Sequence, residues 1–282
     1  MHQVAHEPAE ALANDSAHPL RALNSTPVPP PRYTSRMQKG GALLQEMRLL
    51  VQIWTDASLE ANRAEVILRN PLNKATRARV ADVINRIFVP RFVDGPIKNG
   101  WKLLLPLERL GASASMVRPI YYWFTALAEP IAYDFCCEYL SAQRSNGVRA
   151  IDVKAAASWI CSRNLNWSET VNIKVTRALL AAFRDFGVLD GKAKKWIASP
   201  HLPTPAFAYI AFCMHHSLGA AGRNILAHPD WRLFMLTPAD VERLLLEAHQ
   251  QRFLEYHAAG SVIRLSFPVA TAEQYAHVVL GR

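Results

Sequence analysis

The segment that most constrains this chain is an amphipathic stretch followed at once by a lysine-rich turn, in residues 167–199. On a helical wheel of 3.6 residues per turn, Lys174, Arg177 and Arg184 fall within one narrow stripe, and Gly187 follows where a helix can end. We therefore predict a helix with one buried face and one cationic face. Its predicted buried side chains are Val171, Val175, Ala178, Leu179, Ala182, Phe183 and Phe186.

The residues after this helix predict a short hairpin. Val188-Leu189, Asp190-Gly191 and the run 192–198 follow the pattern strand, turn, strand, and Trp196 is expected to pack on the domain. A cationic helix beside a basic hairpin is how a winged helix binds DNA, with the helix in the major groove and the wing against the phosphates. The alternatives are a solvated surface and a protein docking module. The lysines expected to meet phosphates are Lys192, Lys194 and Lys195.

A second basic region lies at 59–89, where two predicted helices flank a short break at Asn70-Pro71-Leu72, as in a helix-turn-helix. Asn73 is the expected N-cap of the second helix. Free N–H groups at a helix start favour phosphate, so three nearby residues are candidate nucleic-acid contacts. They are Lys74, Thr76 and Arg77.

Charge is concentrated around this second region. Residues 63–109 hold ten Lys or Arg against four Asp or Glu, a net charge of +6 out of +9 for the chain. The plainer interpretation is that Arg79, Asp82 and Arg86 form ion pairs three and four residues apart on a solvated helix face. A pI of about 9.6 favours a polyanionic partner, most often nucleic acid and less often an anionic membrane or an acidic protein.

Catalytic and metal-binding patterns are weak throughout. The four cysteines form no CxxC pair, and His215-His216 and His249 with His257 lack partners at metal-ligand spacing. No nucleophile elbow, HExxH pair or phosphate loop is present, so we expect no enzymatic activity, no metal and no cofactor. The longest apolar run, 207–214, is too short to span a membrane, and no signal peptide is evident. These features predict a soluble cytoplasmic protein without a membrane partner.

The expected fold is mainly α: a two-part helical protein with helix-turn-helix-like and winged-helix-like elements and small β wings. We expect a flexible Pro-rich tail over 1–32, an N-terminal helical domain over 33–147 and a C-terminal winged-helix-like domain over 148–282. Near the end of the chain, Thr237 is expected to cap a helix that runs to about Ala259. A half-buried strand over 261–267 and a helix over 271–280 follow it.

Three segments in this order resemble the BrxA family of BREX (bacteriophage exclusion) systems. They are YTSRMQKGGALLQE at 33–46, the predicted helix and wing at 168–198, and HPDWRLFMLTPADVERLLLEAHQQRFLEYHAAGSVIRLSFP at 228–268. The resemblance covers roughly 33–280, and the long Pro-rich tail departs from it. The positions that fit best are Tyr33, Gly40, Gly41, Leu44, Glu46, Trp231, Gly260 and the strand 262–267.

The resemblance implies a small helical accessory protein that is encoded beside a methyltransferase, an ATPase and a phosphatase-like protein. It further implies protection against phage and binding to double-stranded DNA without catalysis. The cations are not accompanied by an obvious set of Asn or Gln side chains that could read bases in a groove. We therefore expect phosphate contacts to supply most of the affinity for DNA. The rival hypotheses are a scaffold that assembles BREX components, with the aromatic helix Tyr121 to Tyr139 as its docking face, and an RNA-binding helical protein.

Overall fold

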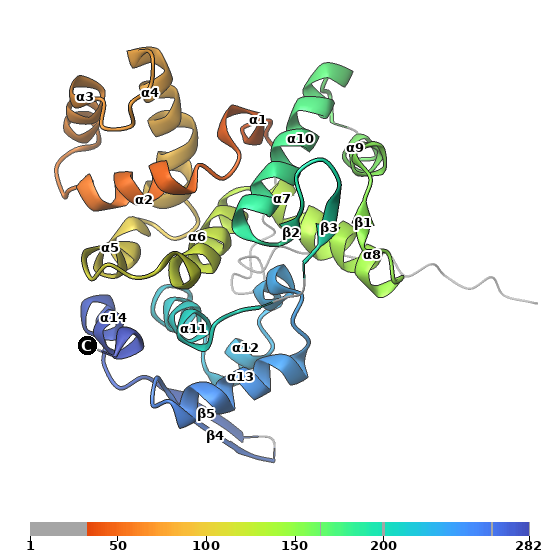
Figure 1. Cartoon of the computed structure of the whole chain (residues 1–282). Helices are drawn as coiled ribbons and strands as arrows, with labels where there is room; N and C mark the ends of the chain where they lie inside the picture. The colour runs from red at the N-terminus through yellow and green to blue at the C-terminus, as the bar shows by residue number, and fades with distance from the viewer. Residues whose placement is uncertain (1–32, 164, 199–200, 261, 282) are drawn as a thin grey trace, which may run out of the picture.

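The computed structural model describes residues 33–163, 165–198, 201–260 and 262–281. The tail predicted over 1–32 lies outside these ranges. Helices dominate, and the strands form two small antiparallel sheets, so the predicted mainly-α fold with small β wings is confirmed (Figure 1). In the described ranges, no helix combines the length and apolar character that crossing a bilayer requires.

The first helices form one end of the molecule. Ser58 caps the third of them, because its hydroxyl accepts a hydrogen bond from the Ala61 N–H at 3.1 Å. The predicted cap at Asn73 is wrong: Asn73 has a left-handed backbone in the turn, and Thr76 caps the next helix by accepting from the Arg79 N–H. The elements are α1 (Met37–Gly40), α2 (Leu44–Ile53), α3 (Leu59–Arg69), α4 (Arg77–Val83), the π-helix η2 (Ile84–Val93) and α5 (Trp101–Arg109).

The aromatic segment in the middle of the chain forms the core. The Trp123 indole N–H donates to the Asp230 carboxylate at 2.7 Å, and the Tyr133 hydroxyl donates to the same carboxylate at 3.0 Å. Because its aromatic side chains are almost fully buried, this segment does not offer the docking face considered above. Its elements are α6 (Ala114–Ala128), α7 (Pro130–Asp134), the π-helix η3 (Phe135–Leu140) and α8 (Ser141–Ser145).

The next unit contains the predicted cationic helix and hairpin. Three strands form an antiparallel sheet in the order β1-β3-β2, in which Trp196 of β3 lies between Ala150 of β1 and Asp190 of β2. The first helix of this unit starts at Val153, because Ile151 belongs to β1. The unit comprises β1 (Ala150–Ile151), α9 (Val153–Cys161), α10 (Glu169–Phe186), β2 (Leu189–Asp190) and β3 (Lys195–Ile197).

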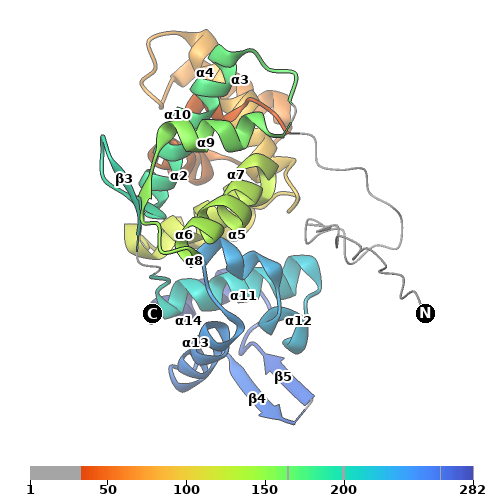
Figure 2. The same cartoon turned by 90° about the vertical axis from the view of Figure 1, so that its right-hand side faces the viewer.

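The remaining elements form a separate layer below the others in Figure 2. The helix predicted to reach Ala259 ends at Gln250, because Arg252 takes a left-handed backbone and the following residues pair with the last strand. The strand predicted over 261–267 is confirmed as β5. The elements are α11 (Thr204–Leu218), α12 (Gly222–Leu226), the 3-10 helix η4 (Pro229–Phe234), α13 (Pro238–Gln250), β4 (Glu255–Ala259), β5 (Val262–Ser266) and α14 (Ala272–Leu280).

Contacts cross the boundary expected between residues 147 and 148. The hydroxyl of Tyr122 on α6 donates to the Leu233 carbonyl oxygen of η4 at 3.2 Å. The Tyr209 hydroxyl of α11 donates to the Leu103 carbonyl oxygen of α5, and both tyrosines are buried. The two expected parts therefore share one hydrophobic core, and their separation into domains stays a prediction.

Candidate nucleic-acid interface

Helix α10 forms where the sequence predicts it. Its N-cap, Ser168, accepts from the Val171 N–H at 3.4 Å, and Gly187 ends it with a left-handed backbone (φ 80°). The apolar side, which includes Phe183 and Phe186, is buried against the rest of the protein. Burial of this face leaves the opposite face of α10 in solvent.

The cations on the exposed face of α10 differ in how they are paired. Lys174 and Arg177 are exposed, and neither forms an ion pair with any residue that the structure describes. Arg184 is half-buried and forms an ion pair with the neighbouring Asp185 at 2.6 Å. Two of the three predicted α10 contacts are therefore free to meet an external anion.

The hairpin after α10 stands out from the body of the protein (Figure 2). Its turn requires glycine: Gly191 has φ 86°, and a Cβ there would overlap the Lys194 carbonyl oxygen. Lys192 and Lys194 are exposed and lack a carboxylate partner among the described residues. The Lys195 ammonium donates to the Lys192 carbonyl oxygen at 3.0 Å. The tip of the hairpin thus presents unpaired positive charge.

The expectation that Trp196 packs on the domain is wrong. Trp196 is 46% exposed, whereas its neighbour Ile197 and the facing Leu189 are buried. Successive side chains of a strand point to opposite faces of the sheet. The inner face is filled by Ile197 and Leu189, so Trp196 is placed on the outer face.

The second predicted site is held differently. The Lys74 ammonium lies 2.6 Å from a carboxylate oxygen of Glu46, and both side chains are largely buried. The Thr76 hydroxyl is the N-cap of α4 and accepts from the Arg79 N–H at 3.1 Å. Thr76 and Arg77 are both exposed, and of the two predicted cations Arg77 alone is outside any ion pair with a described residue.

Ion pairs neutralise most of the positive charge in residues 63–109, all of which are described. Asp82 pairs with Arg79 and Arg86, as the plainer interpretation predicts. Arg91 is fully buried beside Glu129 at 3.1 Å; burial lowers the pKa of Arg91 and the carboxylate opposes that shift. The cations of this segment in ion pairs are Arg69, Lys74, Arg79, Arg86, Arg91, Lys98 and Lys102.

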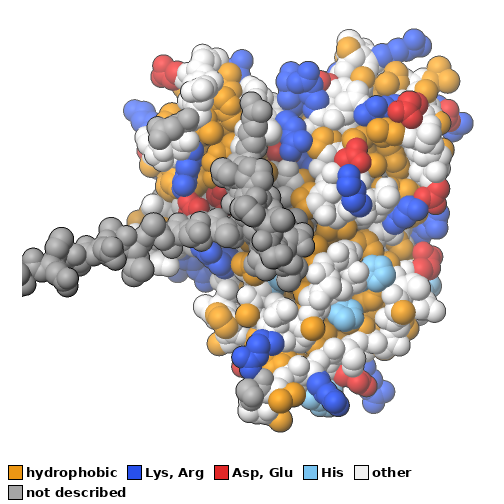
Figure 3. Space-filling model, turned by 180° about the vertical axis from the view of Figure 1, so that it is seen from behind, with side chains coloured by type: hydrophobic (Ala, Val, Ile, Leu, Met, Phe, Trp, Pro, Cys, Tyr) orange, Lys and Arg blue, Asp and Glu red, His pale blue; other side chains and the backbone are white. Residues whose placement is uncertain are grey.

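The two basic regions approach each other through α1. The Arg79 guanidinium of α4 donates to the Lys39 carbonyl oxygen of α1 at 2.6 Å, and Gly41 beside α1 lies close to Ala178 of α10. Helices α4 and α10 reach the same end of the molecule, with α1 between them (Figure 1). Seen from behind the view of Figure 1, the visible surface carries Lys and Arg dispersed among Asp and Glu (Figure 3).

Sequence reasoning missed one cation at this site. Arg149 precedes β1, is exposed, and forms no ion pair with a described residue. Its carbonyl oxygen accepts from the Ile197 N–H at 2.8 Å, which places it beside the last residue of β3. A strand of two residues leaves almost no pattern in the sequence. Arg149 could therefore be recognised only from the pairing of β1 with the hairpin, which the sequence does not show.

Metal ligands and reactive thiols are the other chemical groups to consider. Within the described residues, no group of three or more His, Cys, Asp and Glu side chains is arranged to hold a metal ion. Cys136, Cys137 and Cys213 are buried, and burial raises the pKa of the Cys136 thiol to about 12. The cations of the site that have no carboxylate partner can attract an anion without first breaking an ion pair.

The arrangement defines a class: mainly helical proteins in which an exposed cationic helix is joined to a basic hairpin. The family model of BrxA matches residues 31–213, which include both basic regions and more than half of the chain. This chain therefore belongs to the BrxA family, and the predicted resemblance is confirmed. It is accordingly a component of a BREX phage-defence system. Searches of curated proteins and of solved structures give no match.

Proposed function

We propose that this protein is a non-enzymatic component of a BREX system that binds double-stranded DNA through α10 and the β2–β3 hairpin. It acts in the bacterial cytoplasm together with the other BREX proteins, which the resemblance gives as a methyltransferase, an ATPase and a phosphatase-like protein. The observation that carries the proposal is the set of exposed cations without carboxylate partners on these two adjacent elements. They are Lys174, Arg177, Lys192 and Lys194.

The order of the elements supports a winged-helix mode of binding. A strand, two helices and a hairpin follow one another as β1, α9, α10, β2 and β3, and the sheet order is β1-β3-β2. In helix-turn-helix proteins, the second helix lies in the major groove and the first crosses the backbone. Here α10 is the second helix, and the hairpin is placed to contact phosphates beside it.

The chemistry of the surface favours phosphate contacts over reading of bases. Asn172 is buried, and its amide donates to the Trp167 carbonyl oxygen at 3.5 Å, so it does not face a groove. Lysine and arginine on the exposed side can neutralise phosphates of any sequence. We propose Arg77 at the start of α4 as an additional phosphate contact, and low sequence preference follows.

Reversing the charge of Lys174 and Arg177 tests the proposal. Lys174→Glu with Arg177→Glu should weaken binding to a generic duplex by at least about 100-fold at low salt, since phosphate contacts supply most of the affinity. The matched control is Arg109→Glu with Arg264→Glu, two exposed cations elsewhere that give the same change in net charge. Fluorescence anisotropy measures both. Equal losses in the two variants, or no loss in the first, would overturn the proposal.

A duplex of RNA separates DNA binding from the RNA alternative. The major groove of A-form RNA is deep and narrow, so α10 cannot enter it as it enters B-form DNA. We expect a matched RNA duplex to compete for the protein more weakly than DNA of the same length and sequence. Stronger competition by RNA would favour the rival hypothesis.

A further inference from the structure

The outer face of the three-stranded sheet carries apolar side chains that nothing in the described chain covers. Ala150 pairs with Trp196 across the ladder, so their side chains share the outer face. Val148 stands two residues before Ala150, ahead of β1, and is also exposed. Trp196 is 46% exposed and Val148 is 41% exposed, and both are among the few large apolar side chains left in solvent.

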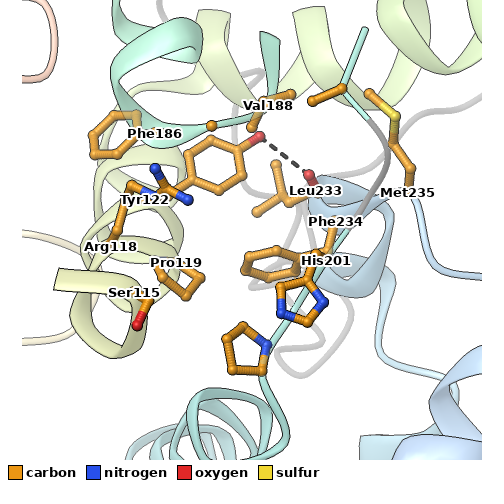
Figure 4. A pocket seen from close by; sticks show the side chains of 13 residues that line it. Ser115, Arg118, Pro119, Tyr122, Phe186, Val188, His201, Leu233, Phe234 and Met235 are labelled. Carbon is orange, nitrogen blue, oxygen red and sulfur yellow. Dashed lines mark hydrogen bonds between the residues drawn. The ribbon is translucent and has the colours of Figure 1, made fainter. Parts of the chain in front are cut away.

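This face continues into a cavity. The Ala198 N–H donates to the Val188 carbonyl oxygen at 3.0 Å, so these residues extend the sheet by one more pair. Both line a cavity of about 80 Å³ that opens between α6, the end of α10 and η4. Figure 4 shows the Tyr122 ring between Phe186 and Phe234, and these three rings make part of its wall apolar. The cavity is large enough to receive part of one apolar side chain.

Positive charge borders the apolar surface. The exposed Arg118 lines the cavity, and its guanidinium carbon would lie 3.0 Å from a Cβ placed on Gly187, so it rests against that backbone. Arg118 forms no ion pair with a described residue, and His201 lines the same cavity. Arg149 lies at the same end of the sheet, because its carbonyl oxygen accepts from the Ile197 N–H at 2.8 Å, and Asp190 is the one carboxylate among the strand residues.

We propose that this surface, defined by Val148, Ala150, Trp196 and the adjoining cavity, docks an acidic segment of a partner protein. The segment carries a bulky apolar side chain that enters the cavity and a carboxylate that pairs with Arg118. Aromatic anchors and arginines supply much of the energy in such interfaces, and complementary charge selects the partner. This inference concerns a different face from the proposed DNA contacts and goes beyond them.

The sheet separates the two surfaces. Leu189 and Ile197 fill the inner face of the sheet, toward the core against which α10 packs, and Trp196 points to the other side. Lys174 and Arg177 lie on α10 itself. The proposed docking surface and the proposed DNA contacts of α10 therefore consist of different side chains.

The probe is a phage-displayed library of random 12-residue peptides, selected on the immobilised full chain. We expect enrichment of peptides that combine Asp or Glu with Trp, Phe, Leu or Ile. Synthetic copies of the enriched peptides should bind Trp196→Ser and Arg118→Ala at least about tenfold more weakly than wild type, because each variant removes one part of the site. Leu246→Ser, which replaces an apolar side chain of 47% exposure on α13, is the matched control and should bind as wild type does.

Several results would overturn the docking site. These are no enrichment, enrichment of basic peptides, or affinity that Trp196→Ser and Arg118→Ala do not change. Competition by duplex DNA would assign the face to DNA, and a dimer lost in Trp196→Ser by sedimentation would assign it to a second copy. DNA affinity measured on Arg118→Ala, which we expect unchanged, distinguishes failure of this inference from failure of the proposed DNA binding.

Discussion

Residues 63–109 and 168–198 are both basic in sequence, yet their cations have different surroundings. In the first segment, seven cations form ion pairs, one of them fully buried. In the second, Arg184 alone pairs with a carboxylate, and the exposed lysines of the hairpin are open to solvent. The net charge of a segment therefore does not locate a binding surface. What matters is whether the fold places a carboxylate near each cation, because a cation without such a partner is available to a ligand.

The difference arises from neighbouring elements. Glu46 of α2, Asp56 before α3 and Glu129 after α6 each reach a cation of the first segment. Helix α10 has acidic residues near its ends, at Glu169 and Asp185. A phosphate that binds a paired cation must first displace its carboxylate, whereas an unpaired cation exchanges only water and counterions.

The largest effect should come from the buried pair of the first segment. Glu129→Ala leaves the fully buried Arg91 without its carboxylate, and Arg36 loses the same partner at 3.4 Å. We expect the free energy of unfolding in urea to fall by about 3–5 kcal/mol, since an uncompensated buried charge is costly.

Lys174→Ala is the control for that measurement. Its side chain is exposed and outside any ion pair with a described residue, so the free energy of unfolding should change by no more than about 0.5 kcal/mol. A similar loss of stability in Glu129→Ala and Lys174→Ala would show that the cations of the two regions do not differ in how much their ion pairs stabilise the fold.

The hairpin provides the next test, which uses salt. Lys192→Ala with Lys194→Ala removes two proposed phosphate contacts. The slope of log affinity against log salt should become shallower by about 2, because each neutralised phosphate contributes about 0.9. Arg69→Ala with Lys98→Ala removes two cations of similar exposure that are paired with Glu65 and Asp94.

That control pair should leave the slope unchanged. If the hairpin variant and the control variant change the slope equally, overall charge, and not local pairing, sets the affinity for DNA.

A smaller effect distinguishes two residues of the helix-turn-helix-like region. Arg77→Ala should reduce the salt slope by about 1, because Arg77 is exposed at the start of α4. Lys74→Ala should leave the slope unchanged and lower the free energy of unfolding by no more than about 1 kcal/mol, through loss of the pair with Glu46. The reverse result would show that Lys74 leaves its carboxylate to meet DNA.

Much of the fold was predictable because local rules decide it. Ser58, Thr237 and Gly187 mark helix ends through capping and backbone freedom that neighbouring residues alone determine. The cap at Asn73 was not predictable in this way, since Asn73 and Thr76 are both good caps and the left-handed turn decides between them.

The parts that escaped prediction depend on contacts distant in sequence. Strand β4 looks helical by itself and becomes a strand by pairing with β5. The stripe on α10 was predictable from periodicity, but its unpaired state was not, because ion pairs such as that of Lys74 with Glu46 join separate helices. Exposure of Trp196 likewise follows from its register in a sheet whose first strand has two residues.

The finest test compares two carboxylates that each pair with one arginine. Asp185→Asn releases Arg184 on α10, and Glu65→Gln releases Arg69 on α3, with the same change in net charge. We expect Asp185→Asn to raise DNA affinity about twofold, in the range of an exposed ion pair, because Arg184 becomes available next to Arg177. Glu65→Gln should leave affinity unchanged, because Arg69 lies on α3, outside the proposed surface. If both substitutions raise affinity equally in anisotropy titrations at one salt concentration, DNA responds to total charge and α10 has no special role.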